Sequence, residues 1–174
     1  MTSPVHKARI PVSGFTFLEL VVVVAIMVLM VGVMVPVYRT SMNAVKVRGA
    51  TRDFLAALAF VQEKSVTSLY EYRFCMDPKE NTYWAERLEK YDADHEKVFE
   101  PVTDSFGVKR TMPDFLRIKD VRTKTDYKSK FPYIACYPNG GCDIAEVHLD
   151  NTRDNERMVV STKGFLGKIE VKQP

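Results

Sequence analysis

The sequence of 174 residues has little net charge and few cysteines. Lys and Arg number 25 against 22 for Asp and Glu, and the net charge of +3 argues against a dedicated nucleic-acid surface. The three cysteines, Cys75, Cys136 and Cys142, are too few for a disulfide framework, and their spacing matches no C-x-x-C metal or redox site. They allow at most one disulfide and one spare thiol.

Histidines are equally scarce, and the three that are present are scattered. His6 lies near the start, His95 lies in a charged loop and His148 lies in a predicted strand. No Ser/His/Asp arrangement and no metal-ligand spacing is visible. The sequence therefore predicts a protein that is not an enzyme and that has no metal site and no cofactor.

One long apolar run stands out against this composition. The 18 residues from Leu20 to Val37 carry no charge, and as a helix they would measure roughly 27 Å, close to the thickness of a bilayer's hydrocarbon core. A buried core helix would seldom stay apolar on every face for five turns. A cleaved secretory signal is a further alternative, because Lys7 and Arg9 could form its basic region. The run is longer than the roughly 7 to 15 apolar residues of such signals, and no small-x-small site follows it.

A single carboxylate, Glu19, lies directly before this run. At the bilayer centre a carboxylate costs about 2.5 to 3.5 kcal/mol, and less near the edge. Glu19 could reach the headgroups by snorkelling, or it could have a partner or a function. The glycine at position 14 favours a partner or a function for Glu19, because Gly14 and Glu19 belong to one motif.

The stretch Gly14-Phe15-Thr16-Phe17-Leu18-Glu19-Leu20, followed by the apolar run and Pro36, resembles the N-terminal signature of the type IV pilin and type II secretion pseudopilin superfamily, with its class III signal peptide. In that family a prepilin peptidase cuts after the glycine and methylates the new amino terminus. The resemblance implies a cut between Gly14 and Phe15, loss of residues 1–14 as a leader, and an N-methylated Phe15.

The resemblance also gives Glu19 a partner, the free amino group of an adjacent subunit in the filament. Two opposite charges in a poorly solvated helix bundle attract far more strongly than in water. It implies a cytoplasmic leader, a single pass through the bacterial inner membrane and a C-terminal head in the periplasm.

From the residues themselves, Gly32 and Pro36 suit an α-helix least and predict a kink or a melted turn.

These segments define an α+β fold, in which a long N-terminal helix packs on an antiparallel β-sheet head. We expect an assembly helix over residues 15–38, an amphipathic continuation over 39–70 that ends near Ser68, and a β-rich head over 71–174. In the amphipathic part, apolar residues recur every three or four positions: Val47, Ala50, Phe54, Leu58 and Val61.

Short β-like runs divided by turn residues begin at Tyr72. Three hairpins are expected, around residues 77–81, 139–141 and 163–167. Residues 91–130 predict long loops with one or two extra strands around Phe115 to Val121. This layout resembles the GspH/FimT group of minor pseudopilins and minor pilins.

The cysteine pairing depends on the loop between Cys136 and Cys142. A two-residue turn at Asn139-Gly140 would place the two cysteines on opposite faces, whereas a three- or five-residue loop would place both on one face and permit a disulfide. Cys75 is expected to be a buried core thiol.

The expected function is that of a structural subunit, a minor pilin or minor pseudopilin, of a type IV pilus or type II secretion filament. Its expected partners are the prepilin peptidase, other subunits and the inner membrane. A DNA-binding minor pilin is the alternative, because basic residues crowd one segment, although acidic residues interrupt it and such runs are most often solvated loops: Lys119, Arg122, Lys124, Lys128 and Lys130.

Overall fold

The computed structural model describes residues 14–104, 106–128, 130–153, 156–163 and 168–172. Within these ranges it contains one α-helix, α1 (Phe17–Ser68), followed by ten β-strands. The chain divides into two compact units, residues 1–43 and residues 44–174. Helix α1 therefore contributes its first part to one unit and its last part to the other, which we call the head unit.

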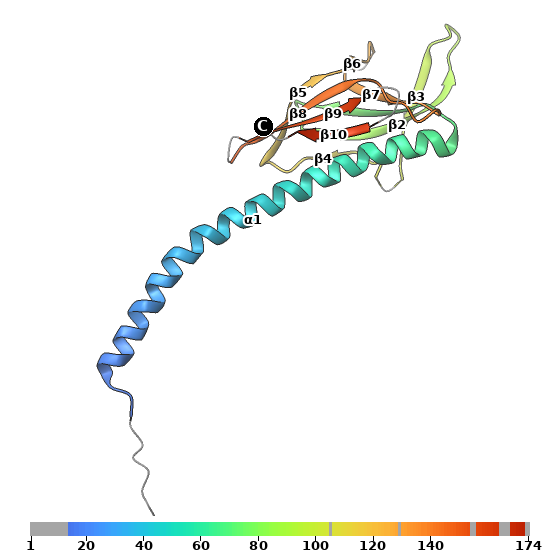
Figure 1. The fold of residues 1–174 in the computed structure, drawn as a ribbon. Helices are drawn as coiled ribbons and strands as arrows, with labels where there is room; N and C mark the ends of the chain where they lie inside the picture. The colour runs from blue at the N-terminus through green and yellow to red at the C-terminus, as the bar shows by residue number, and fades with distance from the viewer. Residues whose placement is uncertain (1–13, 105, 129, 154–155, 164–167, 173–174) are drawn as a thin grey trace, which may run out of the picture. The chain divides into compact units, whose positions relative to one another are not determined.

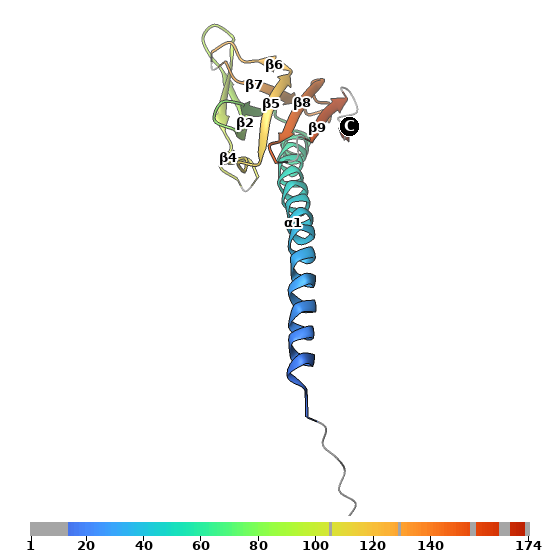
Figure 2. The ribbon, with the colours of Figure 1, turned by 90° about the vertical axis from the view of Figure 1, so that its left-hand side faces the viewer.

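The strands of the head unit form two antiparallel sheets (Figures 1 and 2). The first sheet has the order β3-β2-β1-β7-β6, with β4 beside β2. Its strands are β1 (Tyr72–Asp77), β2 (Thr82–Tyr91), β3 (Lys97–Pro101), β4 (Arg110–Thr111), β6 (Lys124–Thr125) and β7 (Pro132–Cys136). The second sheet has the order β10-β9-β8-β5, from β5 (Leu116–Arg122), β8 (Ala145–Asn151), β9 (Arg157–Lys163) and β10 (Lys168–Lys172).

The last part of α1 packs on both sheets and forms one core with them. The five apolar positions that the sequence predicted to face the sheet are all buried, so this prediction is confirmed. At the centre of the core, the ring of Phe54 meets Phe74 and Tyr83 edge to face, with centroids 5.1 and 5.2 Å apart. Such pairs add about 0.5–1.5 kcal/mol beyond the burial of their area.

The opposite face of the first sheet carries a second, smaller cluster. Because side chains alternate along β1, Phe74 faces α1 while Arg73 and Cys75 face away from it. Cys75 pairs across the strands with Trp84, whose ring meets Phe131 edge to face at 5.2 Å. The indole N–H of Trp84 donates to Glu86 Oε1 at 2.8 Å.

Most of the predicted elements are present at the predicted places. Helix α1 ends at Ser68, and Leu69 then takes a left-handed conformation with φ of 59°. The first hairpin joins β1 to β2, and Asp77 Oδ1 accepts two backbone hydrogen bonds within its turn. Strand β5 covers the strand expected at 115–121, and β9 pairs with β10 as expected. The turn expected at 163–167 falls mostly outside the described residues.

Two expectations about the sheets are wrong. The runs at 132–137 and 143–150 do not form a hairpin: β7 belongs to the first sheet and β8 to the second. The pairing beside the turn stops after an isolated bridge between Cys136 and Cys142. Stronger partners elsewhere, β1 for β7 and β5 and β9 for β8, decide the pairing. The described part of residues 91–130 also holds four strands rather than one or two. The head therefore contains two antiparallel sheets in place of the single sheet that the sequence predicted.

Candidate functional site

The predicted processing position lies on exposed backbone just ahead of α1. Gly14 is exposed, and no other group lies within 4 Å of the place where its side chain would begin. Phe15 and Phe17 are exposed as well. The bond between Gly14 and Phe15 is therefore accessible within the described residues, as cleavage by a peptidase requires.

Thr16 caps the N-terminus of α1, and Glu19 lies in its first turn. The backbone N–H of Glu19 donates to Thr16 Oγ1 at 3.2 Å, and the N–H of Leu20 donates to the Thr16 carbonyl oxygen at 3.2 Å. The sequence Thr-x-x-Glu is the capping-box pattern. A carboxylate in the first turn is also favoured by the helix dipole. Glu19 is exposed, and the structure gives its carboxylate no ion pair among the described residues.

The first part of α1 offers an apolar surface on every side. Phe17–Met34 form an 18-residue window of mean hydropathy 2.9 in which no residue is buried. By length and composition this segment could cross a membrane. The helix is continuous through Gly32 and Pro36, so the structure has no melted turn at these residues. A kink at the same place stays a prediction.

A disulfide joins Cys136 and Cys142 around a five-residue loop, one of the two geometries that the sequence allowed for a bridge. The loop is held against the C-terminal end of α1. Gln62 Nε2 donates to the Gly140 carbonyl oxygen at 2.9 Å, and Ser65 Oγ donates to that of Tyr137 at 3.1 Å. Together these bonds fasten the loop that follows β7 to the end of the helix.

Cys75 is the free thiol and is buried, as expected. Burial, followed by the nearby Glu86 carboxylate, raises the pKa of this thiol well above its ordinary value. A thiol held in its protonated form is a poor nucleophile and a poor metal ligand. Cys75 is therefore a packing residue.

The basic segment that suggested DNA binding is largely paired with acidic residues. Arg122 lies 3.3 Å from Asp120 and 3.6 Å from Glu146, measured between nitrogen and oxygen. Lys124 pairs with Asp143 at 3.0 Å. Lys128 lies 3.5 Å from Asp92 and 2.6 Å from Glu96. Neutralised cations offer less to a phosphate backbone, because that interaction depends on free positive charge.

The histidines are not brought into a catalytic or metal-binding arrangement in the part of the chain that the structure describes. His95 lies in the turn between β2 and β3, His148 lies on β8, and His6 falls outside the described residues. No group of three or more His, Cys, Asp or Glu side chains there could hold a metal ion.

The sequence analysis did not predict two features of the structure. The first is the capping role of Thr16, which its spacing from Glu19 could have indicated. The second is a cavity in the head unit between α1 and the segment from Arg110 to Phe115. Nothing local in the sequence indicates this cavity, because its walls come together only through the pairing of β4 with β2.

Comparison with known proteins identifies the fold. No family model matches the chain, and no curated protein sequence does. The structure is similar to that of the minor pseudopilin EpsH from the type II secretion system of Vibrio cholerae, with a TM-score of 0.54 and 15% identity over 72% of this chain and 94% of that one. A second EpsH structure matches at a TM-score of 0.52 and 14% identity, over 72% and 92%.

The class that these observations define is a pilin-like fold, a long N-terminal helix packed on antiparallel β-sheet. Within that class, the fold is similar to that of the minor pseudopilin EpsH. This agrees with the resemblance carried by residues 14–20 and the apolar run.

Proposed function

We propose that this protein is a non-catalytic structural subunit, a minor pilin or minor pseudopilin, of a pilin-type filament. The observation that carries the proposal is the combination of a minor-pseudopilin fold with an apolar helix segment that has no buried residue. Because the similar structures belong to a type II secretion system, we favour a secretion filament over a type IV pilus.

The apolar segment supports a subunit that passes from membrane to filament. Eighteen exposed residues of mean hydropathy 2.9 need an apolar surrounding, since burying apolar surface gains about 25 cal/mol per Å². Lipid provides that surrounding before assembly, and the helices of neighbouring subunits provide it afterwards. The exchange keeps the segment out of water throughout.

Processing and location complete the proposal. The prepilin peptidase removes residues 1–14 on the cytoplasmic side of the inner membrane and methylates the amino group of Phe15. Residues 15–38 anchor the subunit, and the head faces the periplasm. The disulfide between Cys136 and Cys142 is compatible with that oxidising compartment.

Mass spectrometry of the protein isolated from membranes tests this proposal. We expect a first residue of Phe15 that carries one additional methyl group. A Gly14→Val variant is the control, because a branched side chain at this position obstructs the close approach of a peptidase to the backbone. A mature chain that starts at any other residue would refute the proposed processing, and with it the role of residues 14–20.

A further inference from the structure

A groove lies where α1 passes the edge of the second sheet. It has a volume of about 540 Å³, within the range of roughly 300–1,000 Å³ typical of ligand sites. One side of α1 lines it together with residues of β9 and β10, and β10 is an edge strand because the second sheet has the order β10-β9-β8-β5. All residues that line this groove, which we call the arginine groove, belong to the head unit.

The floor of the arginine groove is packed, and its rims are exposed. Thr51 Oγ1 donates to Met158 Sδ at 3.6 Å, and both side chains are buried. On the two rims, Val45 of α1 is 63% exposed and Val171 of β10 is 41% exposed. A partner can therefore cover apolar side chains that the head leaves in water, without disturbing the core.

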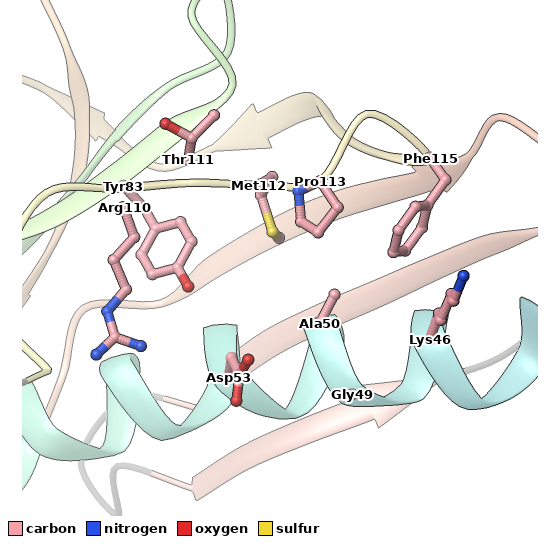
Figure 3. Close-up of a pocket in the computed structure, with 10 residues that line it drawn as sticks. All are labelled: Lys46, Gly49, Ala50, Asp53, Tyr83, Arg110, Thr111, Met112, Pro113 and Phe115. Carbon is pink, nitrogen blue, oxygen red and sulfur yellow. The ribbon is translucent and has the colours of Figure 1, made fainter.

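Two arginines give the groove its charge. Arg48 and Arg52 line it four positions apart on α1, both are exposed, and neither has an ion pair with a described residue. Like charges at this spacing on a helix repel each other. Among the described residues no Asp or Glu lines the groove, and Asp53 instead lines the cavity described above, together with Lys46 (Figure 3). The groove therefore joins an apolar surface to two uncompensated cations.

Gly49 is an observation of a different kind. It is exposed inside a regular helix, where alanine would be more favourable, and no other group lies within 4 Å of the place where its side chain would begin. Packing among the described residues of the head therefore does not require a glycine here. The missing side chain leaves the helix backbone bare between the two arginines, so that another chain can approach it closely.

These features together specify the chemistry of a partner. A guanidinium binds a carboxylate through two parallel hydrogen bonds, and arginine is among the residues that contribute most to binding between proteins. The exposed valines suit an apolar side chain. The phosphate of an anionic lipid would also suit the arginines, but the bare backbone at Gly49 favours a polypeptide, which can pack closely against a helix.

We propose that the arginine groove binds a segment of a different filament subunit, one that carries an apolar side chain flanked by carboxylates. The apolar side chain lies between Val45 and Val171, and the carboxylates pair with Arg48 and Arg52. This inference rests on the proposed function in one respect, because the neighbours of a minor subunit are chains of other kinds. It adds to that function the surface and the charge by which the head recognises such a neighbour.

Photo-crosslinking in cells, with the full chain, tests the contact. Benzoylphenylalanine takes the place of Val45 and is activated by light, and the crosslinked peptide is identified by mass spectrometry. We expect a peptide of another pilin-like subunit, with Asp or Glu within about four positions of the crosslinked residue. A peptide of a second copy, a peptide without such an acid, a lipid adduct alone or no adduct would each overturn the inference.

Charge exchange tests the arginines with the same probe. Arg48→Glu together with Arg52→Glu should lower crosslinking about tenfold, because repulsion replaces attraction, whereas Arg48→Lys together with Arg52→Lys should keep most of it. The matched control is Lys46→Glu, the same change of sign on the same part of α1 but at the other cavity (Figure 3). Lysines in place of the acids of the crosslinked peptide should restore crosslinking to the double glutamate variant. An equal loss in Lys46→Glu, or no restoration, would overturn the charge pairing.

Gly49→Leu separates docking from stability. The new side chain begins in open space and leucine favours a helix more than glycine does, so circular dichroism should show the same or a higher melting temperature. Because the leucine covers the bare backbone, crosslinking from a probe in place of Val171, on the opposite rim, should be lost. Ala59→Leu, at an exposed alanine nearer the end of α1, is the control and should leave crosslinking unchanged. Full crosslinking by Gly49→Leu would show that no chain approaches the helix at this point.

The two proposals fail in different ways. If the subunit starts at Phe15 and enters the filament but shows no crosslink from the groove, the docking surface is wrong and the proposed function stands. If the groove crosslinks to an acidic segment of a protein outside any filament and the chain is never processed at Gly14, the charge preference of the groove stands and the proposed function is wrong.

Discussion

Glu19 is the residue for which two physical explanations compete. As a first-turn carboxylate behind Thr16, it stabilises the N-terminus of α1 by roughly 0.3–1 kcal/mol. As the partner of a neighbouring subunit's amino terminus, it would be worth far more, since removing one member of a buried ion pair costs about 3–5 kcal/mol. The two explanations predict different consequences for the same substitution.

We expect Glu19→Val to leave membrane insertion and cleavage intact and to lower incorporation into the filament by more than tenfold, because every 1.4 kcal/mol is about a factor of ten. Incorporation is measured as the share of the mature subunit that co-purifies with sheared filaments. Glu19→Asp is the control, since it keeps the charge and also suits the helix N-terminus. Normal incorporation of Glu19→Val would leave capping as the only role of this residue.

One side chain in the β1–β2 turn bridges the two sheets by hydrogen bonds. Asn81 Nδ2 donates to the Leu116 carbonyl oxygen at 3.0 Å, and the backbone N–H of Ile118 donates to Asn81 Oδ1 at 3.0 Å. Both partners lie on β5 of the second sheet. Asn81 also has a φ of 55°, a conformation that Asn tolerates better than most residues.

Replacing Asn81 should therefore weaken the head measurably. We expect Asn81→Ala to lower the free energy of unfolding by about 2–3 kcal/mol, from two hydrogen bonds of about 1 kcal/mol each and the cost of a left-handed alanine. Asn81→Gly, which accepts this backbone conformation, should cost about 1–2 kcal/mol. Urea denaturation followed by circular dichroism checks the order of the two variants. Parental stability in both would show that the bridge contributes nothing.

Elements with strong local signals were predictable, and their partners were not. The helical spacing from Val47 to Val61 gave the buried face, and the turn residues at 77–81 gave the first hairpin. The runs around Gly140 carry the same signals as a hairpin, yet β7 and β8 lie in different sheets. Their choice of partners depends on strands far along the chain, and a pattern of nearby residues does not contain that information.

In the candidate site too, residues that are close in sequence were predictable and residues that are far apart in sequence were not. Gly14, Phe15 and Glu19 were found because the motif that contains them is contiguous in sequence. The cavity was not found, because Lys46 on α1 and Arg110 on β4 are 64 positions apart and are brought together only by tertiary packing.

At the scale of the whole molecule, the head unit should fold without the first part of α1. The compact unit begins at Ala44, and every buried core residue of the described chain lies within it. A fragment of residues 44–174 should therefore unfold cooperatively in urea. A fragment of residues 71–174 should not, because the loss of Phe54 and Leu58 uncovers Phe74 and its neighbours.

Circular dichroism and binding of a hydrophobic dye distinguish the two fragments. The longer fragment should give one sharp transition and bind little dye, and the shorter fragment should bind dye and melt without a sharp midpoint. Cooperative unfolding of the shorter fragment would mean that the two sheets form a sufficient core on their own.

Trp84 provides an optical probe of a different layer. It is the only tryptophan of the chain, and it lies on the sheet face away from α1, against Phe131 and with Lys109 Nζ 5.2 Å from its ring. Its emission will therefore follow the detachment of the β6–β7 connection, whereas far-ultraviolet ellipticity follows the helix. Recording both signals along one denaturation curve would show whether the two sides of this sheet come apart in a single event or in succession.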